Sequence, residues 1–402
     1  MDVKEVRGRS PLTPDPSPPS GARGVLFFKV LLLLWASNVF AGDPPPRLEE
    51  FRIKVEKSPD QTVLGRVLIE AQDGGLLVIG RDGKLWSVDA DQLIKRTATE
   101  NEFAPLDREE LDKQLSKELG AGFETVSTKH YVICSNAGRQ YSEWCGTLFE
   151  RLFDAFQSFW KQRGLTLHEP EFPLVAIVFA NVKQFAAFAQ RDAGPDAVTS
   201  KGYYSITTNR IVLYDLLAAT RGNAMLSAAE FRKRLNVEAF NVATVVHEAT
   251  HQIAFNSGMH TRYADNPLWL TEGMAMFFET PDLNNDTGWT TVGAVNAPRL
   301  KQFKTYLGSR RKTDSLATLL KTDGRFTTAK QAVDAYAETW SLNYFLIKER
   351  EADYVRYLNR LAAKPLLMWD TPEQRLAEFE EVFGKTLKEV EIEWLKFARK
   401  LK

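Results

Sequence analysis

Two histidines spaced four residues apart are the first side chains whose types and positions could do chemistry. His247 and His251 flank Glu248 within NVATVVHEATHQIAFN, residues 241–256. Apolar residues recur there at helical spacing without a proline, so both imidazoles should project from one helix face. Imidazoles placed in this way can bind one zinc ion at about 2.0–2.1 Å each, while Glu248 accepts a proton from a metal-bound water. The alternative is a helix with two hydrogen-bonded structural histidines.

A third protein ligand separates these two interpretations. A metzincin would carry a glycine and then a third histidine at fixed offsets after His251, but Ala254 and Ser257 occupy those positions, so that class is excluded. His260 is off register and is expected to be a loop residue. Glu272, in the second apolar segment PLWLTEGMA, completes a site of two histidines and one glutamate with an open position for water. Alternatively, Glu272 only interacts with the dipole at a helix N-terminus.

The HEATH segment followed by WLTEGMA resembles the gluzincin clan of zinc peptidases, and in particular the aminopeptidase N type with its WLNEGFA segment. Over residues 120–400, the segments TKHYVICS, GYYSITTNRIVLYD and YAETWSLNYFL also resemble a bacterial family, domain of unknown function 1570, with a peptidase MA-like domain. The resemblance implies Zn2+ on His247, His251 and Glu272, with Glu248 as general base. By position in the clan, Tyr336 is the candidate donor to the oxyanion; it could equally be a core tyrosine.

One departure from the clan limits the predicted reaction. The Gly-Ala-Met-Glu-Asn signature, which anchors a substrate's free amine in aminopeptidase N relatives, is absent from the sequence. Aminopeptidase activity is therefore not implied, and endopeptidase or other amide hydrolysis is at least as plausible. A different class of function is a cell-envelope binding protein that retains the zincin fold without turnover. The intact Glu248 argues against it, because a non-enzyme has no need of a base.

The elements that must position these residues predict an α+β fold. Strands and helices alternate from about residue 126, and nearly everything beyond residue 230 reads as helical. We therefore predict a zincin-like domain over residues 126–402, with a small mixed sheet and a mostly helical C-terminal half. GYYSITTNRIVLYD should form two short strands at the sheet edge, either as a platform for an extended peptide or as an ordinary structural hairpin.

A small β unit and a connector precede this domain. Residues 47–97 contain apolar runs separated by Asp-Gly turns, which predicts a meander of three or four strands, plausibly a small barrel. Nothing in it looks catalytic, so we expect a packing or docking module. Residues 98–125 are polar and helix-prone and are predicted to be a helical connector.

The N-terminus predicts export. Residues 1–24 are rich in proline and serine and cannot build a core, which indicates a disordered leader. Residues 25–41 form an apolar run that ends in Val-Phe-Ala before a glycine, typical of a signal peptide, with a membrane anchor as the alternative. Periplasmic, cell-envelope or secreted locations all fit. In such an oxidising compartment Cys134 and Cys145 could form a disulfide, or remain two buried thiols.

Composition narrows the expected partners. The 402 residues carry 52 basic and 52 acidic side chains, a formal net charge of zero. No overall field favours nucleic acid, and a membrane is expected only through the possible N-terminal anchor. The expected partner is a peptide or protein substrate. The oligomeric state stays open.

Overall fold

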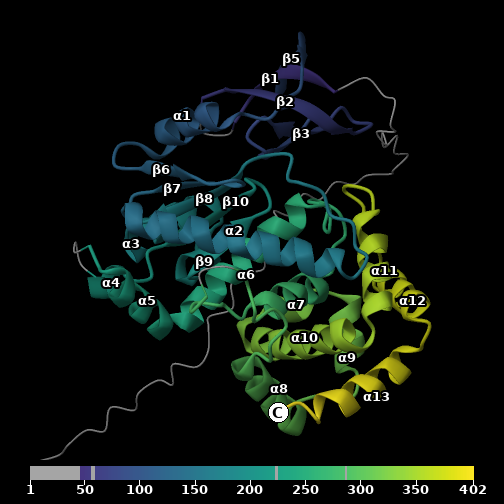
Figure 1. Cartoon of the computed structure of the whole chain (residues 1–402). Helices are drawn as coiled ribbons and strands as arrows, with labels where there is room; N and C mark the ends of the chain where they lie inside the picture. The colour runs from purple at the N-terminus through teal and green to yellow at the C-terminus, as the bar shows by residue number, and fades with distance from the viewer. Residues whose placement is uncertain (1–45, 56–58, 222–224, 286–287) are drawn as a thin grey trace, which may run out of the picture.

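The computed structural model describes residues 46–55, 59–221, 225–285 and 288–402 (Figure 1). The leader predicted for residues 1–24 and the signal peptide or anchor predicted for residues 25–41 lie outside these ranges. Among the helices in the described ranges, none is long and apolar enough to cross a membrane.

An N-terminal sheet of five antiparallel strands, in the order β4-β3-β2-β1-β5, confirms the predicted meander. The strands are β1 Arg47–Ile53, β2 Gln61–Glu70, β3 Leu76–Gly80, β4 Leu85–Val88 and β5 Leu93–Glu102. The predicted barrel is wrong, because β4 and β5 stay at opposite ends of an open sheet. β5 reads LIKRTATENE and is exposed along most of its length, so it lacks the apolar face that closure would need.

Both faces of this sheet carry apolar side chains. One face holds a cluster of its own, built from Phe51, Ile53, Val63, Leu76, Val78 and Val88. The opposite face contributes Ile69, Leu77, Ile79 and Leu85 to a second cluster that also contains Phe172 from the main body. The N-terminal sheet therefore rests directly on the rest of the molecule (Figure 1).

The predicted connector contains one helix between two strands. Helix α1 (Arg108–Leu119) begins with a capping box in which Asp107 and Glu110 bond each other's backbone N–H groups. Residues 98–102 belong to β5, and β6 (Glu124–Ser127) begins within the segment expected to be helical. Because Leu111 and Leu115 of α1 pack beneath the second sheet, the helix is part of the main body.

The second sheet is small and mixed, as predicted, with the order β6-β7-β8-β10-β9. Its other strands are β7 Tyr131–Ser135, β8 Leu174–Phe179, β9 Gly202–Ser205 and β10 Arg210–Tyr214. β7, β8 and β10 are parallel, whereas β6 and β9 run antiparallel at the two edges. β9 is thus a sheet edge, as expected for GYYSITTNRIVLYD. Helices α2 (Arg139–Lys161) and α6 (Ala239–Asn256) cover one face, and α1 and α3 (Val182–Asp192) cover the other.

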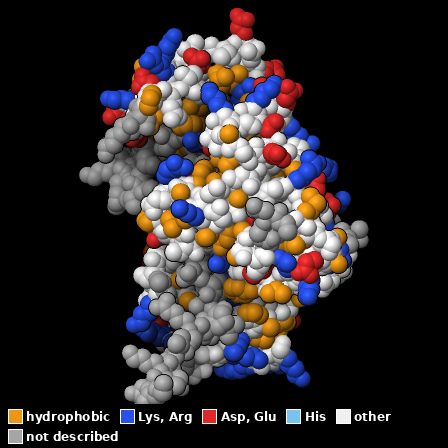
Figure 2. Space-filling view, turned by 90° about the vertical axis from the view of Figure 1, so that its left-hand side faces the viewer, with side chains coloured by type: hydrophobic (Ala, Val, Ile, Leu, Met, Phe, Trp, Pro, Cys, Tyr) orange, Lys and Arg blue, Asp and Glu red, His pale blue; other side chains and the backbone are white. Residues whose placement is uncertain are grey.

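The C-terminal half is helical, which confirms the α+β class. Its elements, together with the short helices that precede α6, are η1 Pro195–Thr199, α4 Ala218–Arg221, α5 Ala228–Val237, α7 Leu268–Phe278, α8 Ala297–Ser309, α9 Ser315–Lys321, η2 Gly324–Phe326, α10 Ala329–Glu349, α11 Glu351–Ala362, α12 Pro372–Phe383 and α13 Leu387–Ala398. α7 packs against both α6 and α10, so it joins the sheet-bearing part to the helical part. On the face drawn in Figure 2, acidic and basic side chains are interspersed.

The two cysteines are free and buried, so the disulfide is not formed and the alternative of two thiols is confirmed. Cys134 on β7 belongs to the apolar cluster beneath α1 and α3, whereas Cys145 on α2 belongs to the cluster on the opposite face of the sheet. The sheet itself separates the two sulfur atoms. Burial raises the pKa of Cys134 to about 12 and that of Cys145 well above its usual range, which keeps both thiols protonated.

Candidate metal centre

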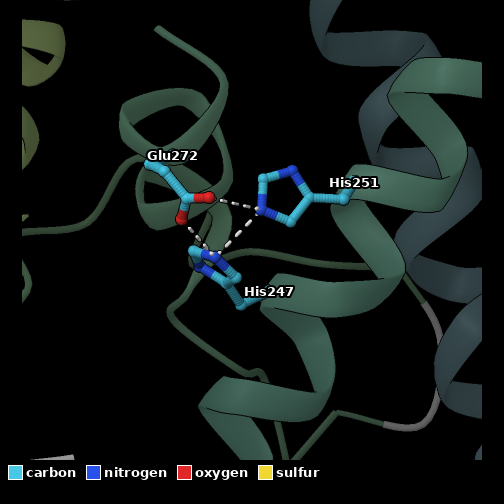
Figure 3. A group of neighbouring side chains, drawn as sticks. All are labelled: His247, His251 and Glu272. Carbon is cyan, nitrogen blue, oxygen red and sulfur yellow. Dashed lines mark hydrogen bonds and ion pairs between the residues drawn. The ribbon is translucent and has the colours of Figure 1, made fainter. Parts of the chain in front are cut away.

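Helices α6 and α7 bring three predicted ligands together in the interior (Figure 3). His247 and His251 lie one turn apart on α6, and Glu272 reaches them from α7. The two histidine Nε2 atoms are 3.0 Å apart, and Glu272 lies 3.1 Å from His247 Nε2 and 3.6 Å from His251 Nε2. All three side chains are buried.

The spacing of these three atoms matches a metal ion. Tetrahedral zinc with bonds of about 2.0–2.1 Å places its ligand atoms about 3.3–3.4 Å apart, and the observed separations are 3.0–3.6 Å. Two imidazole nitrogens at 3.0 Å can share only one proton between them. The Nδ1 atoms of His247 and His251 have no hydrogen-bond partner among the described residues. Two imidazoles and one carboxylate are a donor set that zinc favours.

The charges around the ligands are tightly coupled. Burial alone would lower the pKa of His247, but the hydrogen bond and charge of Glu272 raise it to about 9. Burial raises the pKa of Glu272, yet the two histidines hold it well below its usual range. The pair therefore stabilises a proton at the position where a cation would bind, and a metal ion would replace that proton.

Glu248 lies beside the ligands and is also buried. Its Oε2 accepts a hydrogen bond of 2.9 Å from the backbone N–H of Tyr204, on edge strand β9. Its Oε1 is buried without a hydrogen-bond partner in the described part of the chain. Burial raises the pKa of Glu248. One oxygen is thus held in place by the sheet edge, while the other can accept a proton.

A close approach of two helices sets the position of Glu272. Gly273 lets α10 pack directly on α7, because a Cβ atom there would lie 1.8 Å from Nδ2 of Asn343. That same nitrogen donates to the carbonyl of Trp269, 2.8 Å away. The N–H of Leu268, at the start of α7, donates to a carboxylate oxygen of Asp323 at 2.9 Å. Such a bond satisfies a helix N-terminal N–H that has no partner within the helix.

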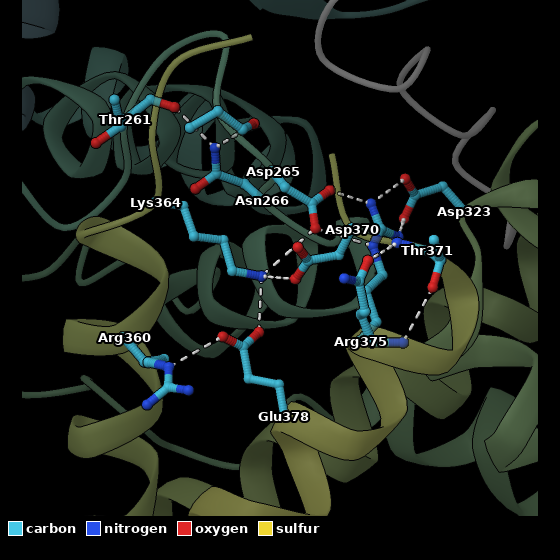
Figure 4. Close-up of polar contacts among 12 residues, drawn as sticks. Thr261, Asp265, Asn266, Asp323, Arg360, Lys364, Asp370, Thr371, Arg375 and Glu378 are labelled. Atoms are coloured by element: carbon cyan, nitrogen blue, oxygen red, sulfur yellow. Dashed lines mark hydrogen bonds and ion pairs between the residues drawn. The ribbon is translucent and has the colours of Figure 1, made fainter. Parts of the chain in front are cut away.

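Buried charges support this start of α7 (Figure 4). Arg375 on α12 donates to Asp323 at 3.1 Å and also to Asp265, in the loop that joins α6 to α7. Lys364 contributes further ion pairs to Asp265 and to Glu378. The loop between the two ligand-bearing helices is therefore fixed by ion pairs to the C-terminal helices.

Behind His247 lies a carboxylate that sequence reasoning missed. Glu279, the C-cap residue of α7, has an oxygen 3.9 Å from His247 Nδ1. Arg299 donates to its two oxygens at 3.1 and 3.2 Å, and Asn296 donates at 3.2 Å. Its position in the sequence could have indicated it. Glu279 follows Glu272 by seven residues, about two helical turns, so the two carboxylates belong to the same helix face.

The structure also brings Tyr336 to this region. It is buried on α10, and Cζ of Arg299 lies 5.9 Å from the centre of its ring. Burial, followed by the charges of Glu272 and Glu248, raises the pKa of Tyr336 well above its usual range. Its phenol therefore stays protonated close to the candidate metal site.

A comparison with known protein families covers the centre of this site. Residues 241–367 match the family described as "Protein of unknown function (DUF1570)".

This DUF1570 region begins within α6 and includes both histidines, Glu248, Glu272 and Tyr336. Over these residues, the match agrees with the family resemblance seen in the sequence. Both sheets lie outside the matched residues. No curated protein matches the chain.

The remaining histidines do not belong to the ligand group in the described part of the chain. His260, in the DUF1570 region, is in the loop between α6 and α7, as expected, and is buried with its ring 5.3 Å from that of Phe255. His130 lies between two carboxylates, 2.6 Å from Glu150 and 3.0 Å from Glu169. His130 therefore ties β7 to α2 and to the loop that precedes β8.

Proposed function

We propose that the protein is a zinc-dependent hydrolase of the gluzincin type and that its substrates are peptides. The observation that carries the proposal is the buried triad of His247, His251 and Glu272, with ligand atoms at metal-binding separations and Glu248 alongside. A structural zinc site would close the coordination with a fourth protein ligand, whereas three ligands leave one position open for catalysis.

A zinc ion held by these three side chains would polarise a scissile carbonyl and lower the pKa of a bound water towards 7. Glu248 would take the water's proton on Oε1, the oxygen without a partner in the described structure, and pass it to the leaving amine. The N–H of Tyr204 holds Oε2 and so fixes the direction in which Oε1 points.

Two further elements support a peptide as the substrate. Tyr336 would donate a hydrogen bond to the developing oxyanion, because its phenol stays protonated and lies close to Glu272. The edge strand β9 runs beside Glu248, so an extended peptide could add to it as a further strand. A strand edge recognises main chain, which favours a peptide over a small amide.

The test is digestion of a broad peptide library, read by mass spectrometry, with wild type and Glu248→Gln compared at equal zinc content. Loss of the base should reduce cleavage by about 10²–10⁴-fold. The cleavage positions would also distinguish an endopeptidase from an exopeptidase. Equal peptide cleavage by wild type and Glu248→Gln would refute the proposal and favour a non-catalytic binding protein.

A further inference from the structure

Three segments that are far apart in sequence meet at the tip of the β9–β10 hairpin, whose strand β9 is hydrogen-bonded to Glu248. They are the β3–β4 turn of the N-terminal sheet (residues 81–84), the β9–β10 turn (residues 206–209) and the loop between α6 and α7 (residues 257–267). We call this meeting point the three-way junction. Because the last two segments adjoin elements of the candidate metal centre, the junction connects the N-terminal sheet to that centre.

One guanidinium joins all three segments. Arg262, in the α6–α7 loop, donates through Nη1 to the carbonyl of Gly83 at 2.8 Å and to that of Ile206 at 3.1 Å. Next to it, the N–H of Leu85 on β4 donates to the carbonyl of Thr207 at 2.8 Å. The edge of the N-terminal sheet is therefore hydrogen-bonded to the tip of the β9–β10 hairpin.

Unusual backbone conformations gather at the same place. Within the described residues, positive φ outside glycine occurs at Asn209 (61°), Tyr263 (63°) and Leu367 (60°). The N–H of Leu367 donates to the carbonyl of Tyr263 at 2.7 Å, and the Tyr263 hydroxyl lies 3.1 Å from Oγ1 of Thr207. Such conformations persist only where the surroundings over-determine them, and they gather at functional sites. The junction is thus held by many contacts at once.

The hairpin transmits its position to the candidate base. The side chain of Asn209 accepts from the Tyr204 hydroxyl at 2.8 Å and from Nδ2 of Asn256, on α6, at 2.7 Å. The N–H of Tyr204 then donates to Oε2 of Glu248 at 2.9 Å. A shift of the hairpin along its own direction would therefore move the hydrogen bond that orients Glu248.

We propose that the N-terminal sheet is a positioning part of the metal centre, acting through Arg262 and the β9–β10 hairpin on the orientation of Glu248. The catalytic consequence rests on the proposed function, whereas the mechanical coupling does not. Arg262 is a positioning residue, because its guanidinium bonds the two turns and acts on Glu248 only through the hairpin.

The test compares Arg262→Met with a matched control in the full-length, zinc-loaded protein. The control is Arg66→Met, which removes a bidentate pair with Glu171 (2.6 and 2.8 Å) between the N-terminal sheet and the main body but no hydrogen bond to the β9–β10 hairpin. Amide hydrogen exchange over residues 202–210 is read by mass spectrometry. We expect Arg262→Met to speed this exchange about tenfold or more by local opening, and Arg66→Met to leave it near wild type.

Peptide-library cleavage gives the second measurement. Arg262→Met should lower kcat by about ten- to a hundredfold through misplacement of the base, with KM and zinc content close to wild type. Arg262→Lys, which keeps a cationic donor, should give an intermediate loss of kcat and carries the comparison if Arg262→Met does not fold.

Two results would overturn the positioning role. One is an amide exchange rate over residues 202–210 that is the same in Arg262→Met as in wild type. The other is an Arg66→Met variant that changes exchange and kcat as much as Arg262→Met does. Faster exchange in a protein whose wild type cleaves no peptide would instead defeat the proposed function alone.

Discussion

At the scale of single residues, the candidate metal centre depends on which atom each side chain presents. Both histidines turn Nε2 inward, towards each other and towards Glu272. Nδ1 of His247 points the other way, towards Glu279 at 3.9 Å. A negative charge near the outer nitrogen of a ligating histidine raises the basicity of the ring. Glu279 is itself held by Arg299 at 3.1 Å, so the negative charge that faces His247 Nδ1 is fixed in place.

The first prediction concerns this carboxylate. Glu279→Gln should weaken zinc affinity by about tenfold, the low end for an outer carboxylate, because Glu279 acts on His247 through its charge at 3.9 Å without a hydrogen bond. Competition with a metal chelator measures the affinity. Glu169→Gln is the matched control, since Glu169 pairs with His130, a histidine outside the ligand group. Equal zinc affinity in the two variants would show that Glu279 does not support the ligand.

At the scale of elements, the placement of α7 depends on the size of one side chain. Gly273 sits where α7 and α10 touch, with Asn343 filling the space that a methyl group would need. Glu272 precedes this contact directly in the sequence. The glycine of WLTEGMA therefore has a packing role in presenting the third ligand.

A second prediction follows for this contact. Gly273→Ala should destabilise the protein by about 1–3 kcal/mol through overpacking and should also reduce zinc content, because α7 must move. Gly308→Ala, on α8, is the control: no atom lies within 4 Å of its added Cβ. There the gain in helix propensity should stabilise by about 0.5–1 kcal/mol. Urea denaturation measures the unfolding free energy of both variants. Similar changes in Gly273→Ala and Gly308→Ala would contradict the packing argument.

The third prediction concerns the buried charges in Figure 4. Arg375→Met leaves Asp265 without its guanidinium partner and removes a bond to Asp323, so it should cost about 3–5 kcal/mol of unfolding free energy. Arg360→Met is the control, because the half-exposed Arg360 contributes about 0–1 kcal/mol through its pair with Glu378. If Arg375→Met lowers the unfolding free energy no more than Arg360→Met does, these buried ion pairs do not support α7.

The elements also show what sequence could and could not predict. The placement of His247 and His251 side by side could be predicted, because helical periodicity alone puts them on one face. Whether the N-terminal sheet closes could not be predicted, because closure depends on whether β5 meets β4 in space. The fate of Cys134 and Cys145 depended on which face of the sheet each one occupies.

The backbone groups of the candidate site were the hardest part to predict from the sequence. The N–H of Tyr204 reaches Glu248 only because β9 is an edge strand, with β10 on its other side. Every residue except proline has such an N–H, so no sequence pattern singles this one out. The edge itself was predicted, but its bond to Glu248 needed the fold.

At the scale of the whole molecule, the candidate metal site lies between two parts of the chain. α6, with two ligands, packs on the second sheet, whereas α7, with the third, packs on α10 of the helical half. A bound metal ion would therefore join the sheet-bearing part to the helical part. Metal binding and overall stability should be linked.

The fourth prediction tests this link. Removal of zinc by a chelator should lower the unfolding free energy by about 4 kcal/mol, if free zinc had been at about 1,000 times its Kd. Thermal unfolding with and without chelator measures the change. The midpoint of His251→Ala should not respond to chelator. A wild-type midpoint equally insensitive to chelator would mean that no metal joins the two parts.

The most direct test of the central claim is the zinc content of purified wild type, Glu248→Gln and His251→Ala. The account predicts about one zinc per chain in the first two proteins, because Glu248 is not a ligand, and little zinc in His251→Ala. Full zinc occupancy in His251→Ala would contradict the assignment of His247, His251 and Glu272 as the metal centre.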